Sequence, residues 1–189
     1  MKMMDIYRGM LVGDNHVFQL AMDGKAKKYA LGNIAVLGVF FGLSNLLGTL
    51  QTTPDLPLSD KFAIITPLLF SVAGIVIMCG ALIGFTMVYW AAARAFGGQG
   101  GLGLILDLIG LAAIPFWILA PLLNYTIRYA QDGPGRYFLV ITIIGSFLWS
   151  FKLLRRSLMA AQGLETTRAT IAVTAMWIFS ISSVYVFLP

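Results

Sequence analysis

Charged residues are scarce in this chain, and their scarcity indicates its class. Only 11% of the 189 residues are Asp, Glu, Lys or Arg, 59% are hydrophobic, and the mean hydropathy is +0.85. A soluble domain carries about 25% charged residues, so this chain lacks the polar surface to cover a globule in water. Its apolar residues also gather in long runs. The sequence therefore predicts an all-α integral membrane protein.

Histidine and cysteine are almost absent. Cys79 is the single cysteine, which excludes an internal disulfide and a C-x-x-C metal motif. His16 is the single histidine, which excludes the pair of intramembrane histidines that usually holds a haem. No predicted helix carries paired carboxylates, and no Ser–His–Asp set can be assembled. We therefore expect no enzyme activity, no cofactor and no metal site.

Five apolar runs predict about five transmembrane helices, because each run has about 20 residues or more, enough to cross ~30 Å of hydrocarbon. The predicted spans cover residues 29–50, 68–96, 104–128, 136–156 and 168–188. Pro67 is expected to turn or kink the chain before the second span, and Pro115 and Pro121 to kink the third. Together the spans form one transmembrane domain over residues 29–189.

Residues 1–28 are mixed and charged, which predicts a separate cytoplasmic segment at the membrane interface. Asp14 or Asn15 can cap a short helix that runs towards Met22. We expect two short amphipathic helices here. Their membrane-facing residues would be Ile6, Met10, Val17, Phe18 and Leu20.

The distribution of lysine and arginine indicates the orientation of the chain in the membrane. If the N-terminus is cytoplasmic, only Lys61, Arg128 and Arg136 of the 13 Lys and Arg residues fall outside, and the other ten fall inside. This bias follows the positive-inside rule and accounts for the net charge of +5 without nucleic acid as a partner. We expect a multi-pass protein of the bacterial inner (cytoplasmic) membrane, with its C-terminus on the outer side.

Residues 98–103 match the G-x-G-x-x-G pattern letter by letter, but the context is wrong for a dinucleotide site. An apolar helix precedes the pattern where a strand is needed, and positions 116–126 hold no acidic residue. We predict a flexible cytoplasmic turn that includes Gly97 and Gly98.

Asp107 is the most unusual residue, a carboxylate inside an apolar run. Carboxylates in a membrane are costly and often functional, so a proton or ion site is one interpretation. The alternatives are that Asp107 reaches water at the interface, or that it pairs with Arg94 across the Gly-rich turn. A transporter normally shows several buried ionisable groups, and this chain offers one.

Two glycine pairs predict close helix–helix contacts. Gly38 and Gly42, and likewise Gly80 and Gly84, lie one turn apart on one helix face. Such faces pack either within the bundle or against another protein.

Polar and kinked positions within the spans have a structural and a functional interpretation. Asn33, Asn45 and Asn124 favour hydrogen bonds between helices over solute binding. The kink at Pro115 is architectural unless it marks a transport site, which would need a matching break in an inverted repeat.

Lys152, Arg155 and Arg156 form a basic cluster at the cytoplasmic end of the fourth span. Anionic lipid headgroups are the simpler partner for this cluster. An acidic partner protein is the alternative.

Three short stretches carry a family resemblance: ARAFGGQG at 93–100 with Ile114-Pro115 downstream, WSFKLL at 149–154 and AAQGL at 160–164. They resemble the Yip family, the Ypt/Rab-interacting-protein-like membrane proteins, over roughly residues 30–188. The resemblance implies five spans and a small non-catalytic membrane protein. Eukaryotic members carry a long polar cytosolic extension, whereas only 28 residues precede the first span here. The chain is therefore similar to the compact prokaryotic type, and Rab binding is not carried over.

These observations favour a non-catalytic, membrane-embedded accessory or scaffolding protein. It would be a small subunit that packs against other integral membrane proteins in a hetero-complex, with the lipid bilayer around it. The alternative is a small-solute or ion transporter that uses Asp107, Asn124 and the Pro-kinked third helix.

Overall fold

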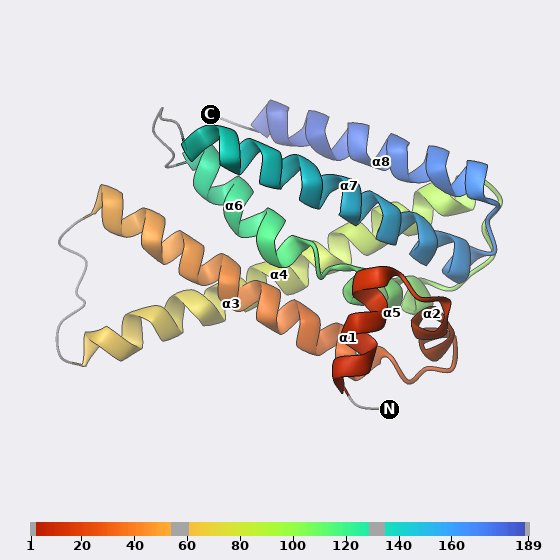
Figure 1. Cartoon of the computed structure of the whole chain (residues 1–189), viewed down its shortest axis with the longest axis horizontal. Coiled ribbons are helices and arrows are strands. Elements are labelled where there is room, and N and C mark those ends of the chain that lie inside the picture. Colours follow the sequence, from red (N-terminus) through yellow and green to blue (C-terminus); the bar gives the residue numbers. More distant parts are fainter. Residues whose placement is uncertain (1–2, 54–60, 129–134, 188–189) are drawn as a thin grey trace. The chain divides into compact units, whose positions relative to one another are not determined.

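The computed structural model describes residues 3–53, 61–128 and 135–187, which are helical apart from short turns (Figure 1). The helices are α1 (Met3–Val12), α2 (Asn15–Met22), α3 (Lys27–Thr52), α4 (Phe62–Ala95), α5 (Leu102–Ala112), α6 (Phe116–Arg128), α7 (Gly135–Gln162) and α8 (Thr166–Phe187). No strand occurs in these ranges. The all-α prediction is confirmed.

The chain divides into two compact units, each made of separate stretches of sequence. Unit 1 contains Met1–Ala30, Leu82–Ala112 and Phe151–Pro189, and unit 2 contains Leu31–Ala81 and Ala113–Ser150. Helices α3, α4 and α7 contribute residues to both units. The boundary between an interfacial segment 1–28 and a single domain 29–189 remains a prediction.

Three helices of the described part are long and apolar enough to cross a membrane: α3, α4 and the part of α7 from Tyr137 to Gln162. α5 and α6 would count as a fourth span if taken together. α8 covers the fifth predicted span as a helix, but its side chains from residue 180 onwards lie outside the described part. A membrane protein with three or four candidate spans is therefore supported, and the count of five is not confirmed.

The second predicted span starts earlier than expected. α4 begins at Phe62 and continues through Pro67 without a break, so the predicted turn at this proline is wrong. A proline six residues into a helix removes a single backbone hydrogen bond close to the helix start. The hydroxyl of Ser71 donates to the Pro67 carbonyl over 2.8 Å, which adds a side-chain bond at this point.

The third predicted span is broken instead of merely kinked. α5 ends at Ala112, α6 begins at Phe116, and the two are bent by 75° at the break. Pro115 lies in the break, where its missing N–H and its ring prevent a continuous helix. The Phe116 and Trp117 N–H groups close the turn on the Ala113 and Ile114 carbonyls, over 2.9 and 3.0 Å. Pro121 lies inside α6 and does not interrupt it.

Unit 2 is held together where α3 crosses the first part of α4. A Cβ added to Gly42 would collide with the Phe70 carbonyl oxygen, and one added to Gly74 would collide with the Gly38 carbonyl oxygen. The two backbones touch here, which only glycine allows. The Gly38–Gly42 pair therefore packs within the chain, which is the first of the two alternatives that its sequence left open.

Unit 1 has an apolar core contributed by the ends of several helices. The fully buried side chains include Ile105, Leu108 and Leu111 of α5, Leu153 and Leu158 of α7, and Val173 of α8. Phe151 meets Trp177 edge to face, with ring centroids 5.2 Å apart.

Candidate functional site

The first feature is a helical hairpin formed by α1 and α2, which lie side by side next to α5 (Figure 1). α1 ends at Val12, and Gly13 follows it with a φ of 75°, a conformation that glycine adopts at little cost. The Gly13 N–H donates to the Met10 carbonyl and the Asp14 N–H to the Gly9 carbonyl, which makes a Schellman cap. The Asp14 carboxylate then accepts from the His16 N–H over 3.1 Å and caps α2. The predicted cap and the predicted helix towards Met22 are both confirmed.

The apolar face of this hairpin is covered by protein. Ile6, Met10, Val17 and Phe18 are each at most 3% exposed, so the expectation that they contact the membrane is wrong. An amphipathic helix buries its apolar face equally well against lipid or against other helices, and here α2 packs on α5. The side chain of Leu20, also expected to face the membrane, lies outside the described part. Burial, with Tyr29 as the second cause, raises the pKa of Tyr7 on α1.

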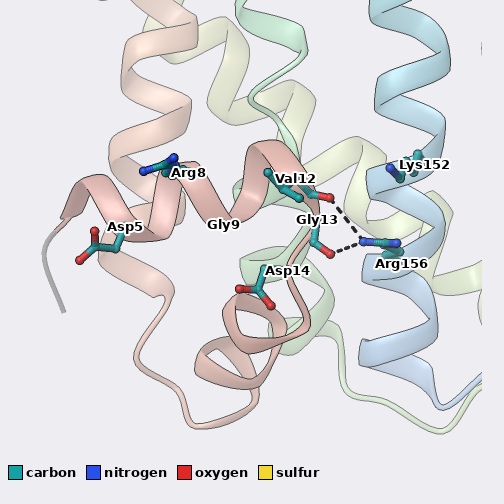
Figure 2. Close-up of a pocket in the computed structure, with 8 residues that line it drawn as sticks. All are labelled: Asp5, Arg8, Gly9, Val12, Gly13, Asp14, Lys152 and Arg156. Carbon is teal, nitrogen blue, oxygen red and sulfur yellow. Dashed lines mark hydrogen bonds between the residues drawn. The ribbon is translucent and has the colours of Figure 1, made fainter.

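A groove runs between this hairpin and α7 (Figure 2). Its volume is about 650 Å³, and it is lined by Asp5, Arg8, Gly9, Val12, Gly13, Asp14, Lys152 and Arg156. Figure 2 shows Lys152 and Arg156 on α7 beside the Val12–Gly13 turn, with Asp5 and Arg8 further along α1. The groove brings together three basic and two acidic side chains.

Arg156 ties the hairpin to α7. Its Nη1 donates to the Gly13 carbonyl and, over 3.5 Å, to the Val12 carbonyl. A Cβ at position 13 would lie 2.6 Å from this Nη1, so a larger residue would displace the guanidinium, and the positive φ also favours glycine. A helix C-terminus favours a cation, which is the electrostatic reason for an arginine here.

Only two residues of the basic cluster predicted at Lys152, Arg155 and Arg156 lie on the groove. Lys152 and Arg156 are four residues apart and line the groove from one face of α7. Arg155 does not line it, and its Nε is buried without a hydrogen-bond partner among the described residues.

The Gly-rich turn between α4 and α5 is the second feature. α4 ends in a Schellman cap with Gly97 at a φ of 88°, where the Gly98 N–H donates to the Ala93 carbonyl over 2.8 Å. The side chain of Gln162 then binds Gly100 twice, since Oε1 accepts from its N–H and Nε2 donates to its carbonyl, each over 3.0 Å. These two hydrogen bonds fix the turn on the end of α7. The predicted turn is confirmed, but it is fixed by hydrogen bonds where flexibility was expected.

Arg94 interacts with this turn and not with Asp107. Its guanidinium lies over the Trp90 ring, 5.4 Å from the centroid, and the Trp90 indole donates to the Gly100 carbonyl over 3.3 Å. No ion pair between Arg94 and Asp107 occurs among the described residues. The charged neighbour that acts on Asp107 is Lys27 at the start of α3, and Asp107 itself is partly exposed.

Unit 2 contains a polar seam between α3 and α6. Asn124 Nδ2 donates to Asn45 Oδ1 over 2.8 Å, and the Ser44 hydroxyl donates to the Pro121 carbonyl over 3.0 Å. The Trp117 indole donates to the Asn33 carbonyl over 3.1 Å. The expected interhelical hydrogen bonds of Asn45 and Asn124 are confirmed. Pro115, at the break before α6, is buried.

The second glycine pair has different surroundings from the first. A Cβ added to Gly80 or to Gly84 on α4 would meet nothing within 4 Å. In the most apolar 18-residue stretch of α4, only 11% of the residues are buried. This face of α4 is open.

Two residues that hold the site together were not among the predicted positions. Gly13 precedes the Asp14-Asn15 break, and its place directly before a helix cap was the available signal. Gln162 lies in the AAQGL stretch that resembles the Yip family, but nothing local shows that its amide binds a turn 62 positions away. No cluster of three or more His, Cys, Asp or Glu residues suited to a metal occurs in the described ranges.

Comparison with known proteins identifies the family of the chain. The Yip1 domain matches residues 15–188, a stretch that includes α2, the Gly-rich turn and the end of α7. No curated protein matches the chain significantly, and no solved structure does. Because the match covers nearly all of the sequence, the chain belongs to the Yip1 domain family of membrane proteins.

Proposed function

We propose that this chain is a non-catalytic accessory or scaffolding subunit, which packs against partner membrane proteins in a larger complex. The observation that carries the proposal is the open Gly80–Gly84 face of α4. Gly38, Gly42 and Gly74 make close contacts within the chain, whereas a Cβ at Gly80 or Gly84 would meet nothing within 4 Å among the described residues. Small residues spaced four apart allow another helix to approach closely, and lipid tails gain little from them.

The orientation expected from the charges is part of this proposal. Unit 2 contains Lys61, Arg128 and Arg136, and the other ten Lys and Arg residues belong to unit 1. Five of the eight acidic residues also belong to unit 1, so the entire net charge of +5 lies there. In a bacterial inner membrane, the positive-inside rule would put the basic residues of unit 1 in the cytoplasm together with the N-terminus, and the C-terminus on the outer side.

The test is mass spectrometry of the tagged protein after gentle native extraction. A defined set of stoichiometric partner chains is expected, and Gly80→Leu or Gly84→Leu should remove at least one of them. Gly145→Leu on α7 is the matched control, because a Cβ there also meets nothing within 4 Å. A chain that is extracted alone with lipid, in mild detergent, would refute the accessory role.

A transporter of small solutes or ions is the second candidate, and the break at Pro115 favours it. Broken helices bind solutes in many transporters, because the freed backbone groups line the site. Asp107 of α5 and Asn124 of α6 lie on the two sides of this break. Asp107→Asn should then abolish solute or proton flux into vesicles while the protein stays folded, and unchanged flux would exclude this function.

A further inference from the structure

The groove between the α1–α2 hairpin and α7 carries charges of both signs. Arg8, Lys152 and Arg156 line it together with Asp5 and Asp14. Within the described residues, Lys152 and Asp14 share this hollow without forming an ion pair with each other. A groove of this kind suits a ligand that has a negative and a positive end.

Arg156 is positioned to bind an anion. Its two hydrogen bonds to the hairpin carbonyls both use Nη1, so the Nε–H and the Nη2–H groups are not used by them. The bonds also fix the guanidinium in place, which lowers the entropy lost when a ligand binds. Arginine and lysine are the usual partners of a phosphate group.

The rim of the groove is apolar. Val12, which lines the groove, is 67% exposed, and its neighbour Leu11 is 46% exposed. Exposed aliphatic side chains next to a charged hollow suit a lipid, whose headgroup and acyl chains need both surfaces. An acidic peptide fits less well, because Asp5 and Asp14 would repel it.

We propose that the groove binds the phosphoethanolamine headgroup of a membrane phospholipid. Arg8, Lys152 and Arg156 bind the phosphate, and the Asp14 carboxylate accepts hydrogen bonds from the ammonium group. The acyl chains lie along Leu11 and Val12. The site is independent of the accessory role proposed above, because it involves neither α4 nor a protein partner.

The charge pattern predicts a selectivity that a general basic surface would not have. Phosphatidylglycerol carries the phosphate but no ammonium, so it would leave Asp14 opposite an anionic lipid. Phosphatidylcholine carries a quaternary ammonium with no N–H group and cannot donate a hydrogen bond to a carboxylate. Phosphatidylethanolamine should therefore bind more tightly than either.

The experiment is native mass spectrometry of the detergent-solubilised full chain, titrated with phosphatidylethanolamine, phosphatidylglycerol or phosphatidylcholine of identical acyl chains. Lys152→Gln and Arg8→Gln should each weaken phosphatidylethanolamine binding by about tenfold, as expected for one lost charge-assisted contact. Asp14→Asn keeps the helix cap but removes the carboxylate, and should shift the preference towards phosphatidylglycerol. Arg168→Gln, an exposed arginine of the same unit outside the groove lining, is the control and should change nothing.

The shift in preference with Asp14→Asn, together with an unaffected Arg168→Gln, would establish the site. Tighter binding of phosphatidylglycerol to the unaltered chain would overturn it. So would a loss of phosphatidylethanolamine binding in Arg168→Gln as large as the loss in Lys152→Gln or Arg8→Gln. Soluble phosphoethanolamine that binds as tightly as the lipid would overturn the assignment to a lipid. Gel filtration of each variant shows whether the fold is intact.

Discussion

Gly100 and Gly101 are neighbours in sequence but differ in their surroundings. A Cβ at Gly100 would collide with the Ala161 carbonyl oxygen, whereas one at Gly101 would meet nothing within 4 Å. The side chain of Gln162, 3% exposed, uses the space at Gly100 for its paired hydrogen bonds. Single atoms therefore decide whether the α4–α5 turn can lie against the end of α7.

Gly100→Ala is expected to destabilise the protein by about 1–3 kcal/mol, the usual result of forcing an extra methyl into a packed contact. The clash is with a backbone carbonyl, which cannot move aside as a side chain can. Gly101→Ala is the matched control and should stay within about 0.5 kcal/mol of the original chain. Thermal unfolding in detergent, followed by loss of monodisperse protein, measures the difference. Equal melting temperatures for the two variants would contradict the packing of this turn.

Asp14 provides a second test at this scale. Asp14→Ala should destabilise the α1–α2 hairpin by about 1 kcal/mol, because the His16 N–H loses its acceptor. Asp14→Asn should cost much less, since asparagine caps helices about as well as aspartate. Amide hydrogen exchange over residues 15–22 reports the difference directly. Faster exchange in both variants would show that the charge matters more than the cap.

At the scale of elements, glycine decides which helices approach each other. Gly42 of α3 touches the backbone of α4, whereas a Cβ added to Gly80 of α4 would meet none of the described residues within 4 Å. The two positions look alike in sequence, because each begins or ends a G-x-x-x-G pair in an apolar run. Their difference arises only from which faces the fold brings together.

Gly42→Ala should separate α3 from α4 and destabilise unit 2 by about 1–3 kcal/mol. Gly80→Ala should instead be neutral or stabilising by up to about 1 kcal/mol, because alanine is the better helix former where there is room for it. Thermal unfolding of both purified variants gives the comparison. A destabilising Gly80→Ala in the isolated chain would mean that the α4 face is occupied within the chain itself.

Local features were predictable from sequence, and features that depend on the rotation of helices about their axes were not. The cap at Asp14 and the interruption at Pro115 depend on one or two residues, and both occur. A pair between Arg94 and Asp107 was one alternative suggested by proximity in sequence, but in the fold Arg94 stacks on Trp90. The length of α4 was underestimated, because a proline near a helix start costs less than one in the middle.

The apolar face of the hairpin is a second feature whose partner surface the sequence did not reveal. A hydrophobic stripe indicates that a helix face will be covered but not by what, since lipid and protein offer similar apolar surroundings. Met10 and Val17 are covered by protein, while Leu11 and Val12 remain exposed beside the groove. Lys152 and Arg156 were recognised as a basic cluster, but their partner surface on α1 required the fold.

At the scale of the whole molecule, charge is distributed unevenly between the two units. Unit 1 carries ten of the 13 basic residues, and unit 2 carries three basic and three acidic ones. Helices α3, α4 and α7, which are three candidate membrane spans of the described part, each contribute to both units. A chain inserted by the positive-inside rule would therefore expose the loops of unit 1 to the cytoplasm.

Cysteine labelling tests this orientation without changing any charge. In a Cys79→Ala background, Met22→Cys and Thr53→Cys place one thiol before and one after α3, at positions that are exposed. A membrane-impermeant maleimide applied to intact cells should label residue 53 and spare residue 22, because α3 crosses the bilayer once. Lysed cells, in which both positions should react, provide the control for thiol accessibility. Labelling of residue 22 alone would invert the orientation, and labelling of both in intact cells would show that α3 does not span the membrane.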